Sequence, residues 1–185
     1  MIIHLGYVSI SKTLDITSSK TITYTEFKKN NNYNKINNII IENLTNLEKI
    51  INYNIKNNIH FYRLTSKLIP LATHKDLNFD YITPYKKHYN QIATKIKKNN
   101  LRIDTHPDQF CVLNSTKKEI IDNSINILKY HYNILNALNI KNKIIKKLGN
   151  KKVNKNFYLT VTMFIIDVIC FIIKNNTIKI NLIIL

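Results

Sequence analysis

The densest group of side chains that could do chemistry lies in one short stretch, RIDTHPDQFCVLN, at residues 102–114. His106 can bind a divalent metal ion, and Asp104 and Asp108 place carboxylates near it. The stretch begins on a β-prone run, so its polar side chains are expected to project from the carboxyl end of a strand. His-Pro-Asp is also a common structural turn, because Asp and Pro both favour turn conformations. Taken alone, the stretch predicts a turn that is either metal-binding or structural.

A second polar stretch, FYRLTSKLIPLATH, covers residues 61–74 and also begins on a β-prone run. His74 ends it and is a second candidate metal ligand, although a single histidine of this kind is commonly an ordinary surface side chain. Arg63 is one of only two arginines among 28 basic residues. An arginine in a lysine-rich chain indicates bidentate recognition of phosphate or carboxylate, and a structural salt bridge explains it equally well.

Considered together, the two stretches predict more than either does alone. Two histidines at the ends of neighbouring parallel strands could share one metal ion, and a complete site would also need carboxylates. Imidazole suits Mn, Zn or Fe, and divalent metal clusters commonly drive phosphodiester hydrolysis. The other four histidines lie within predicted strands or helices and are expected to have ordinary structural roles: His4, His60, His88 and His131.

The pattern of apolar residues predicts alternating strands and helices. Short apolar runs predict strands over residues 2–8, 59–64 and 101–105, with a fourth starting near 140. Apolar residues at helical spacing predict helices over 36–58, 85–98 and 117–138. The expected inner faces are Ile40, Leu44, Leu47, Ile51 and Ile55 in the first helix, Tyr89, Ile92 and Ile96 in the second, and Ile121, Ile125, Leu128, Tyr132 and Leu135 in the third. The resulting β-α order predicts a parallel sheet whose post-strand loops share one functional face.

The net charge of +17, from 28 basic and 11 acidic side chains, favours polyanionic partners such as nucleic acid or anionic lipid. A coding sequence rich in A and T would produce the same Lys, Asn and Ile bias without functional meaning. The charge alone therefore does not establish a polyanionic partner. The two cysteines, Cys111 and Cys170, form neither a disulfide scaffold nor a metal-binding pattern, which indicates a reducing compartment. No secretory signal is recognised at the N-terminus, and a cytoplasmic location is expected.

Four motifs occur in order within residues 1–140: LGY at 5–7, TSSKT at 17–21, HFYRLTS at 60–66 with Pro70 and His74 after it, and DTHPDQF at 104–110. In these motifs the chain resembles the UV damage endonuclease family. The resemblance implies an α/β fold of the (β/α)8 TIM-barrel type, with a divalent metal cluster, usually described with manganese, at its C-terminal face. It also implies metal-dependent incision of damaged double-stranded DNA, on the 5′ side of UV photoproducts, in DNA repair.

The resemblance further implies roles for residues that would contact DNA. Gln109 and Phe110 match a pair that enters the duplex at the lesion, where a ring can fill the gap left by unstacked bases and an amide can bond to base edges. Tyr7 matches a position beside the flipped lesion. Arg63 is a less well supported candidate for contacting phosphate.

The metal ligands are where the chain departs from the family. His74 and His106 match two metal-binding histidines, but Lys147 stands about where the next histidine belongs, and an ammonium group cannot bind a cation. The later carboxylate and histidine ligands have no counterpart. Little or no incision activity is therefore expected of these 185 residues.

The length of 185 residues is short for a complete barrel, which needs about 250 residues. Residues 1–140 are predicted to be the N-terminal half of a barrel, its first three to four β/α units, and residues 141–185 an unrelated apolar tail rich in Lys, Ile and Asn. A reading-frame shift near residues 140–150 would explain that tail. Its apolar run over residues 157–173 contains Asp167 and is shorter than the roughly 20 apolar residues of a membrane span. A membrane partner is therefore not expected.

Two other classes of function are compatible with parts of the sequence. A metal-dependent sugar isomerase or epimerase would use the same kind of barrel, but it needs neither the Gln109-Phe110 pair nor a basic surface. A non-catalytic basic fragment could bind DNA, or a membrane through its hydrophobic tail. No protein partner is implied.

Overall fold

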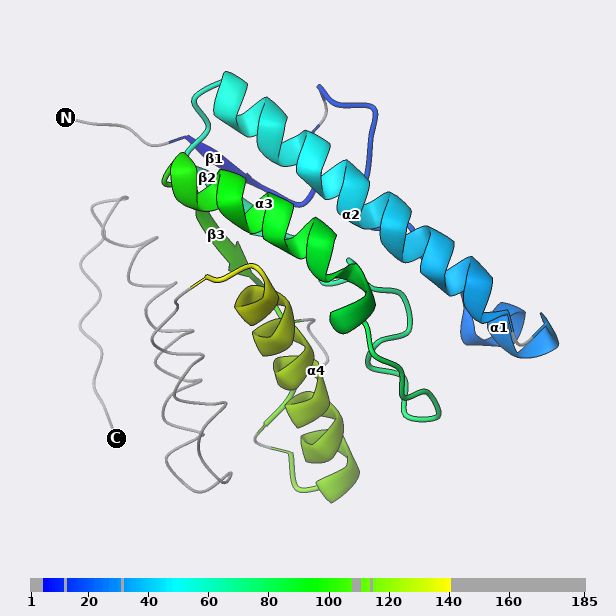
Figure 1. The fold of residues 1–185 in the computed structure, drawn as a ribbon. Coiled ribbons are helices and arrows are strands. Elements are labelled where there is room, and N and C mark those ends of the chain that lie inside the picture. Colours follow the sequence, from blue (N-terminus) through cyan, green and yellow to red (C-terminus); the bar gives the residue numbers. More distant parts are fainter. Residues whose placement is uncertain (1–4, 12, 31, 108–110, 114, 141–185) are drawn as a thin grey trace, which may run out of the picture. The chain divides into compact units, whose positions relative to one another are not determined.

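The computed structural model describes residues 5–11, 13–30, 32–107, 111–113 and 115–140, and the structural findings concern these residues. Their elements in chain order are the strand β1 (Gly6–Val8), the helices α1 (Tyr24–Asn30) and α2 (Tyr33–Lys56), the strand β2 (Phe61–Leu64), the short 3-10 helix η1 (Thr83–Tyr85), the helix α3 (Lys86–Lys98), the strand β3 (Arg102–Thr105) and the helix α4 (Lys118–Ala137) (Figure 1). The predicted order of strands and helices is confirmed over this part of the chain. The strand expected near residue 140 lies outside the described residues.

The three strands form one parallel sheet in the order β1-β2-β3. Tyr7 is opposite Tyr62, and Arg63 is opposite both Val8 and Asp104. Each parallel pair is connected through a helix, as the sequence predicts, so the loops after the strands leave the same edge of the sheet. The fold is α/β with a partial parallel sheet.

Alternation along the strands separates the two faces of the sheet. Tyr62 and Leu64 of β2, and Ile103 and Thr105 of β3, are buried on the face that the helices cover (Figure 1). Arg63, one residue from Tyr62, and its register partner Asp104 therefore point to the opposite face. This opposite face is where the ion-paired residues Arg63 of β2 and Asp104 of β3 lie.

Helices α2 and α3 pack as their apolar spacing predicts. In α2, Ile40, Leu44, Leu47 and Ile51 are buried, whereas Ile55 is only half-buried and its neighbour Asn54 takes the buried position. The three residues expected on the inner face of α3 are all buried: Tyr89, Ile92 and Ile96. These two helices supply much of the described core.

The inner face of α4 differs from the prediction. Of the five residues expected there, only Leu135 is buried, and the others are half-exposed. The buried residues of the helix are Ser124, Tyr130, His131, Ile134 and Leu135. Ser124 lies on this observed face, where its hydroxyl donates to the Val112 carbonyl oxygen at 3.1 Å and accepts from the Val112 N–H at 2.8 Å.

Two local features were not predicted from the sequence. The helix α1 lies in a stretch where no helix was predicted, and Phe27 packs in the core at 4% exposure. Gly6 lies directly against Phe61, where an added Cβ would come within 2.6 Å of the Phe61 Cβ atom. A side chain at position 6 would therefore disturb the β1–β2 pairing. Among the described helices, none combines the length and apolar character that crossing a membrane requires.

Candidate functional site

The loops that follow the three strands form the candidate site, because parallel strands bring their carboxyl ends to one edge of the sheet. His106 directly follows β3 and is exposed. His74 lies in the long loop after β2. The structure therefore places both predicted metal ligands in loops at the same edge of the sheet.

His74 is held in a tight turn of its loop. Its N–H donates to the Leu71 carbonyl oxygen at 3.0 Å, and Leu71 has the left-handed φ of 58°. The His74 ring stacks on Tyr24 of α1 with centroids 3.9 Å apart. Its Nδ1 accepts the Asp76 N–H at 3.3 Å and lies 4.0 Å from the Asp76 carboxylate. This arrangement leaves Nε2 as the ring atom that could bind a metal ion.

His106 takes its position from the end of β3. The preceding residue, Thr105, is buried, and its hydroxyl shares a hydrogen bond of 2.6 Å with Nδ1 of His131 in α4. His131 is itself only 4% exposed. His131, for which an ordinary structural role was expected, is thus hydrogen-bonded to the last residue of β3.

The fit of a metal ion to these residues is incomplete. Among the described residues, no group of three or more His, Cys, Asp or Glu side chains is placed to hold one ion. Two imidazoles in loops at one edge of a sheet have the donor chemistry of a Mn, Zn or Fe site. His74 and His106 are thus candidates for part of a metal site and do not complete one.

Arg63 and Asp104 form an ion pair across β2 and β3. Arg63 Nε lies 2.9 Å from Asp104 Oδ1, and Nη2 lies 3.5 Å from Oδ2. Both side chains are mostly buried, and the guanidinium also lies 6.0 Å from the centre of the Phe61 ring. Of the two explanations for Arg63, the structural salt bridge is present in the structure. A contact with DNA phosphate stays a prediction.

Tyr7 lies on the helix-covered face of the sheet. Its hydroxyl donates to Asn54 Oδ1 of α2 at 2.8 Å, and its ring centre is 5.1 Å from that of Tyr62. Partial burial raises the pKa of the Tyr7 hydroxyl above its usual value. The structure does not bring Tyr7 together with Arg63, and its role beside a lesion stays a prediction. Gln109 and Phe110 lie outside the described residues.

A buried asparagine that the sequence analysis did not identify connects two of the loops. Asn43 of α2 is 0% exposed, and its Oδ1 accepts the Lys20 N–H at 2.9 Å. Its Nδ2 donates to the carbonyl oxygens of Lys20 at 2.8 Å and of Leu68 at 2.9 Å. One amide thus ties the loop after β1 to the loop after β2. Because the chain has 29 asparagines, its residue type gave no signal.

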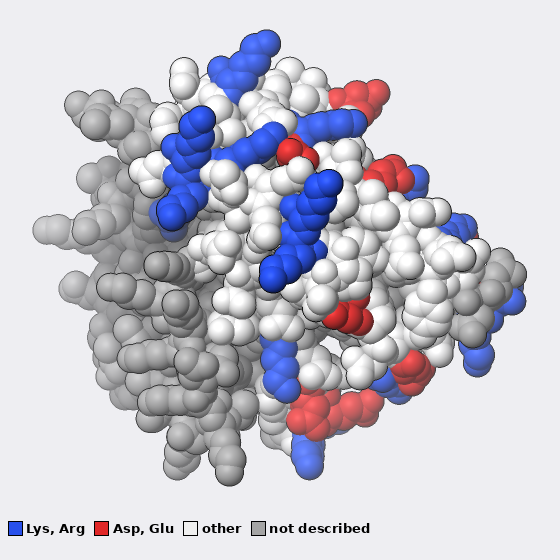
Figure 2. Space-filling model, viewed as in Figure 1, with Lys and Arg blue, Asp and Glu red and all other residues white. Residues whose placement is uncertain are grey.

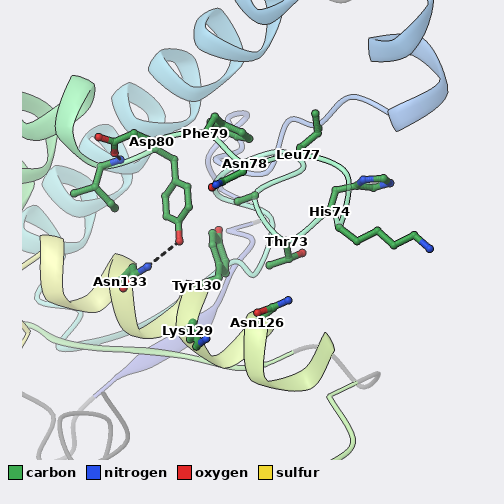
Figure 3. Close-up of a pocket in the computed structure, with 14 residues that line it drawn as sticks. Thr73, His74, Leu77, Asn78, Phe79, Asp80, Asn126, Lys129, Tyr130 and Asn133 are labelled. Atoms are coloured by element: carbon green, nitrogen blue, oxygen red, sulfur yellow. Dashed lines mark hydrogen bonds between the residues drawn. The ribbon is translucent and has the colours of Figure 1, made fainter. Parts of the chain in front are cut away.

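A pocket of about 450 Å³ lies between the loop after β2 and α4 (Figure 3). Tyr130 rises from α4 toward the loop, and Asn126, Lys129 and Asn133 line the same side. Asn133 Nδ2 donates to the Tyr81 hydroxyl at 3.0 Å. His74 belongs to the lining, so the pocket adjoins the candidate site.

Charged side chains are dispersed on the face that Figure 2 shows. Among the residues that the structure describes, lysine and arginine side chains alternate there with uncharged surface and several acidic groups, and they form no continuous basic patch on this face. The high net charge therefore does not by itself mark a nucleic-acid surface on the helix-covered side.

Comparison with known proteins identifies the class to which this fold and these loops belong. The family model described as UV-endonuclease UvdE matches residues 3–167. The chain belongs to this family, which confirms the resemblance seen in the motifs. The match extends past residue 140, into the segment expected to be an unrelated tail.

Particular relatives agree with the family. The chain is 41% identical over 144 residues to the UV DNA damage endonuclease of Bacillus mycoides (strain KBAB4), a match that covers 76% of this chain and 45% of that protein. It is 42% identical over 144 residues to the UV DNA damage endonuclease of Bacillus cereus (strain B4264). The crystal structure of SacUVDE matches with a TM-score of 0.71 and 32% identity, covering 76% of this chain and 47% of that chain. The chain thus spans about half the length of the curated relatives it matches.

Proposed function

We propose that this chain is part of a metal-dependent endonuclease that incises the backbone of damaged double-stranded DNA on the 5′ side of UV photoproducts. The observation that carries the proposal is the position of His106 at the end of β3, in a chain that belongs to the UV-endonuclease UvdE family. His74, in the loop after the neighbouring strand, supports it.

The proposed fold is a (β/α)8 barrel, of which residues 1–140 form the first three to four units and residues 141–185 a separate segment. The face of the sheet opposite the helices supports this arrangement. Val8 of β1, the register partner of Arg63, lies on this face and is 52% exposed. Apolar side chains on a strand need a partner to bury them, and further strands of a barrel would supply it.

In the proposed mechanism, His74 and His106 contribute two imidazole ligands to a divalent metal site, with manganese as the proposed metal. When bound, the metal would supply a Lewis acid for the scissile phosphate.

Gln109 and Phe110 would enter the duplex at the lesion, and Tyr7 would lie beside the extruded nucleotides. Arg63 would hold the Asp104 side chain in place through their ion pair. To bind phosphate, Arg63 would have to break that ion pair. A DNA substrate fits a cytoplasmic location.

Nicking of supercoiled plasmid and binding to short duplexes together test the proposal. With manganese present, the 185-residue chain should bind UV-irradiated duplex more tightly than unirradiated duplex. It should nick irradiated plasmid slowly or not at all, because Lys147 replaces an expected ligand. His106→Ala is the matched control and should abolish any nicking that does occur.

Equal binding to both duplexes with no nicking would overturn the proposal and favour a non-catalytic basic fragment. Rapid manganese-dependent nicking would contradict the expected weak activity.

A further inference from the structure

Two adjacent residues of α4 each hold the chain segment that leads to one of the candidate ligands. We infer that Tyr130 and His131 are positioning residues, Tyr130 for the loop that carries His74 and His131 for the strand end that carries His106. The inference rests on the proposed function, which gives the two histidines their role as ligands. The sequence predicted no role for Tyr130 and only an ordinary structural one for His131, and neither is itself a candidate ligand.

His131 acts on the end of β3. Its Nδ1 shares the hydrogen bond of 2.6 Å with the Thr105 hydroxyl, and both side chains are at most 5% exposed. Thr105 is the last residue of the strand and His106 is the next residue in the chain. A short buried bond one residue before His106 restricts the direction in which the backbone leaves the sheet.

Tyr130 acts on the loop after β2. Its hydroxyl accepts the Ile69 N–H at 3.1 Å, and Ile69 is 3% exposed. The preceding carbonyl oxygen, that of Leu68, accepts from Asn43 of α2 at 2.9 Å. The loop is therefore fixed from both sides immediately before the turn in which the His74 N–H donates to Leu71. Without the Tyr130 hydroxyl, a buried N–H would lose its partner, which is costly enough to shift the loop.

Helix α4 links the two positioning residues. Tyr130 and His131 are consecutive, their rings meet edge to face with centroids 5.1 Å apart, and both are buried. Because the two residues are consecutive in one helix and pack in the core, neither can shift without the other. One rigid element thus sets the position of both histidine-bearing segments relative to each other.

The first test uses the metal-free 185-residue chain and NMR spectra of its histidine rings. In the unaltered protein, stacking on Tyr24 should give the His74 ring a ring-current shift. Tyr130→Phe should reduce that shift and leave the His106 signals unchanged. His131→Leu should move the His106 signals and leave those of His74 unchanged. His131→Asn, which keeps a polar atom near the Nδ1 position, should restore the His106 signals.

The second test is a Mn²⁺ titration of the same proteins, followed by paramagnetic broadening of the two histidine rings. Tyr130→Phe and His131→Leu should each weaken the apparent Mn²⁺ affinity about tenfold, as expected for residues that orient metal ligands. The matched control is Tyr85→Phe, since the Tyr85 hydroxyl also makes a hydrogen bond, at 2.7 Å to Asn37, but serves neither histidine-bearing segment. Its Mn²⁺ affinity should equal that of the unaltered chain.

The outcomes separate this inference from the proposed function. If Mn²⁺ broadens neither ring in the unaltered chain, the metal site of the proposed function is wrong, and the metal-free spectra still decide the positioning roles. If the variants lose thermal stability while both histidines keep their signals, the positioning inference is overturned. Should His131→Leu fail to fold, Thr105→Val breaks the same bond from the strand side and should move the His106 signals in the same way.

Discussion

Arg63 and Asp104 occupy opposed positions on neighbouring parallel strands, with Nε 2.9 Å from Oδ1. The pair lies on the face of the sheet that the helices do not cover, and both side chains are mostly shielded from solvent. Asp104 is thereby held by a guanidinium two residues before His106. The Asp104 carboxylate, which is the carboxylate of β3 closest in sequence to His106, is therefore already bound in an ion pair.

Replacing Arg63 should reveal this structural role. Arg63→Ala leaves a mostly buried carboxylate without its partner, which is expected to lower the free energy of unfolding by about 1–3 kcal/mol. Urea unfolding of Arg63→Ala, of Asp104→Asn and of the variant with both changes gives the coupling energy between the two residues. A coupling energy near zero, together with a weaker salt dependence of DNA binding, would instead assign Arg63 to a phosphate.

Asn43 should be among the polar residues most important for stability. Asn43→Leu removes three hydrogen bonds, one of them fully buried, and leaves backbone groups of Lys20 and Leu68 unsatisfied. The free energy of unfolding should fall by about 2–4 kcal/mol, measured by urea unfolding.

Asn46 provides a comparison on the same helix. Its amide donates to the Thr17 carbonyl oxygen at 2.9 Å in an exposed position. Asn46→Ala should cost less than about 1 kcal/mol, because water can replace the lost partner. Equal losses in the two variants would show that the Asn43 bonds do not hold the loops together.

The sequence predicts the strand and helix order because the apolar spacing in α2 and α3 has one clear inner face. The apolar spacing in α4 indicates no single inner face, since isoleucine, leucine and tyrosine occur all around the helix. The stripe through Ile121 and Leu128 fits helical spacing as well as the face that is buried in the structure. The face that is buried carries Ser124, Tyr130 and His131, each of which is hydrogen-bonded to another segment of the chain.

The site was predictable only where the chemistry lies in a local motif. His74 and His106 stand in recognisable polar stretches after strands. The residues that anchor those stretches, Asn43 and His131, come from helices far away in the sequence, and their residue types are unremarkable in this composition. Long-range hydrogen bonds of this kind have no local pattern.

Gly6 should tolerate no side chain. An added Cβ would lie 2.6 Å from the Phe61 Cβ atom and 2.8 Å from the Phe61 carbonyl oxygen. The backbone oxygen belongs to a paired strand and cannot move freely, so Gly6→Ala should lower the free energy of unfolding by about 1–3 kcal/mol. Val8→Ala, at a residue of the same strand that is 52% exposed, should change it by less than about 0.5 kcal/mol. Comparable unfolding curves for the two variants would contradict the close β1–β2 approach.

Tyr62 should make stability fall in alkaline solution. Its side chain is 0% exposed, its hydroxyl donates to the Ser9 carbonyl oxygen at 3.1 Å, and burial raises its pKa from 10.0 to about 12. Below pH 10 both the folded and the unfolded chain keep the proton, so this contribution to stability is fully present. Between pH 10 and about 12 the unfolded chain releases the proton first, and the contribution decreases by about 1.4 kcal/mol for each pH unit.

Tyr62→Phe isolates that contribution from the other groups that titrate in the same range. Burial also raises the pKa values of Tyr89 and Tyr130, which shifts the stability of both proteins in the same direction. The difference in unfolding free energy between the unaltered chain and Tyr62→Phe cancels these shared terms. Measured by urea unfolding, the difference should stay constant up to about pH 10 and then move in favour of the variant. A difference that does not change up to about pH 11 would show that the Tyr62 hydroxyl is as accessible in the folded protein as in the unfolded chain.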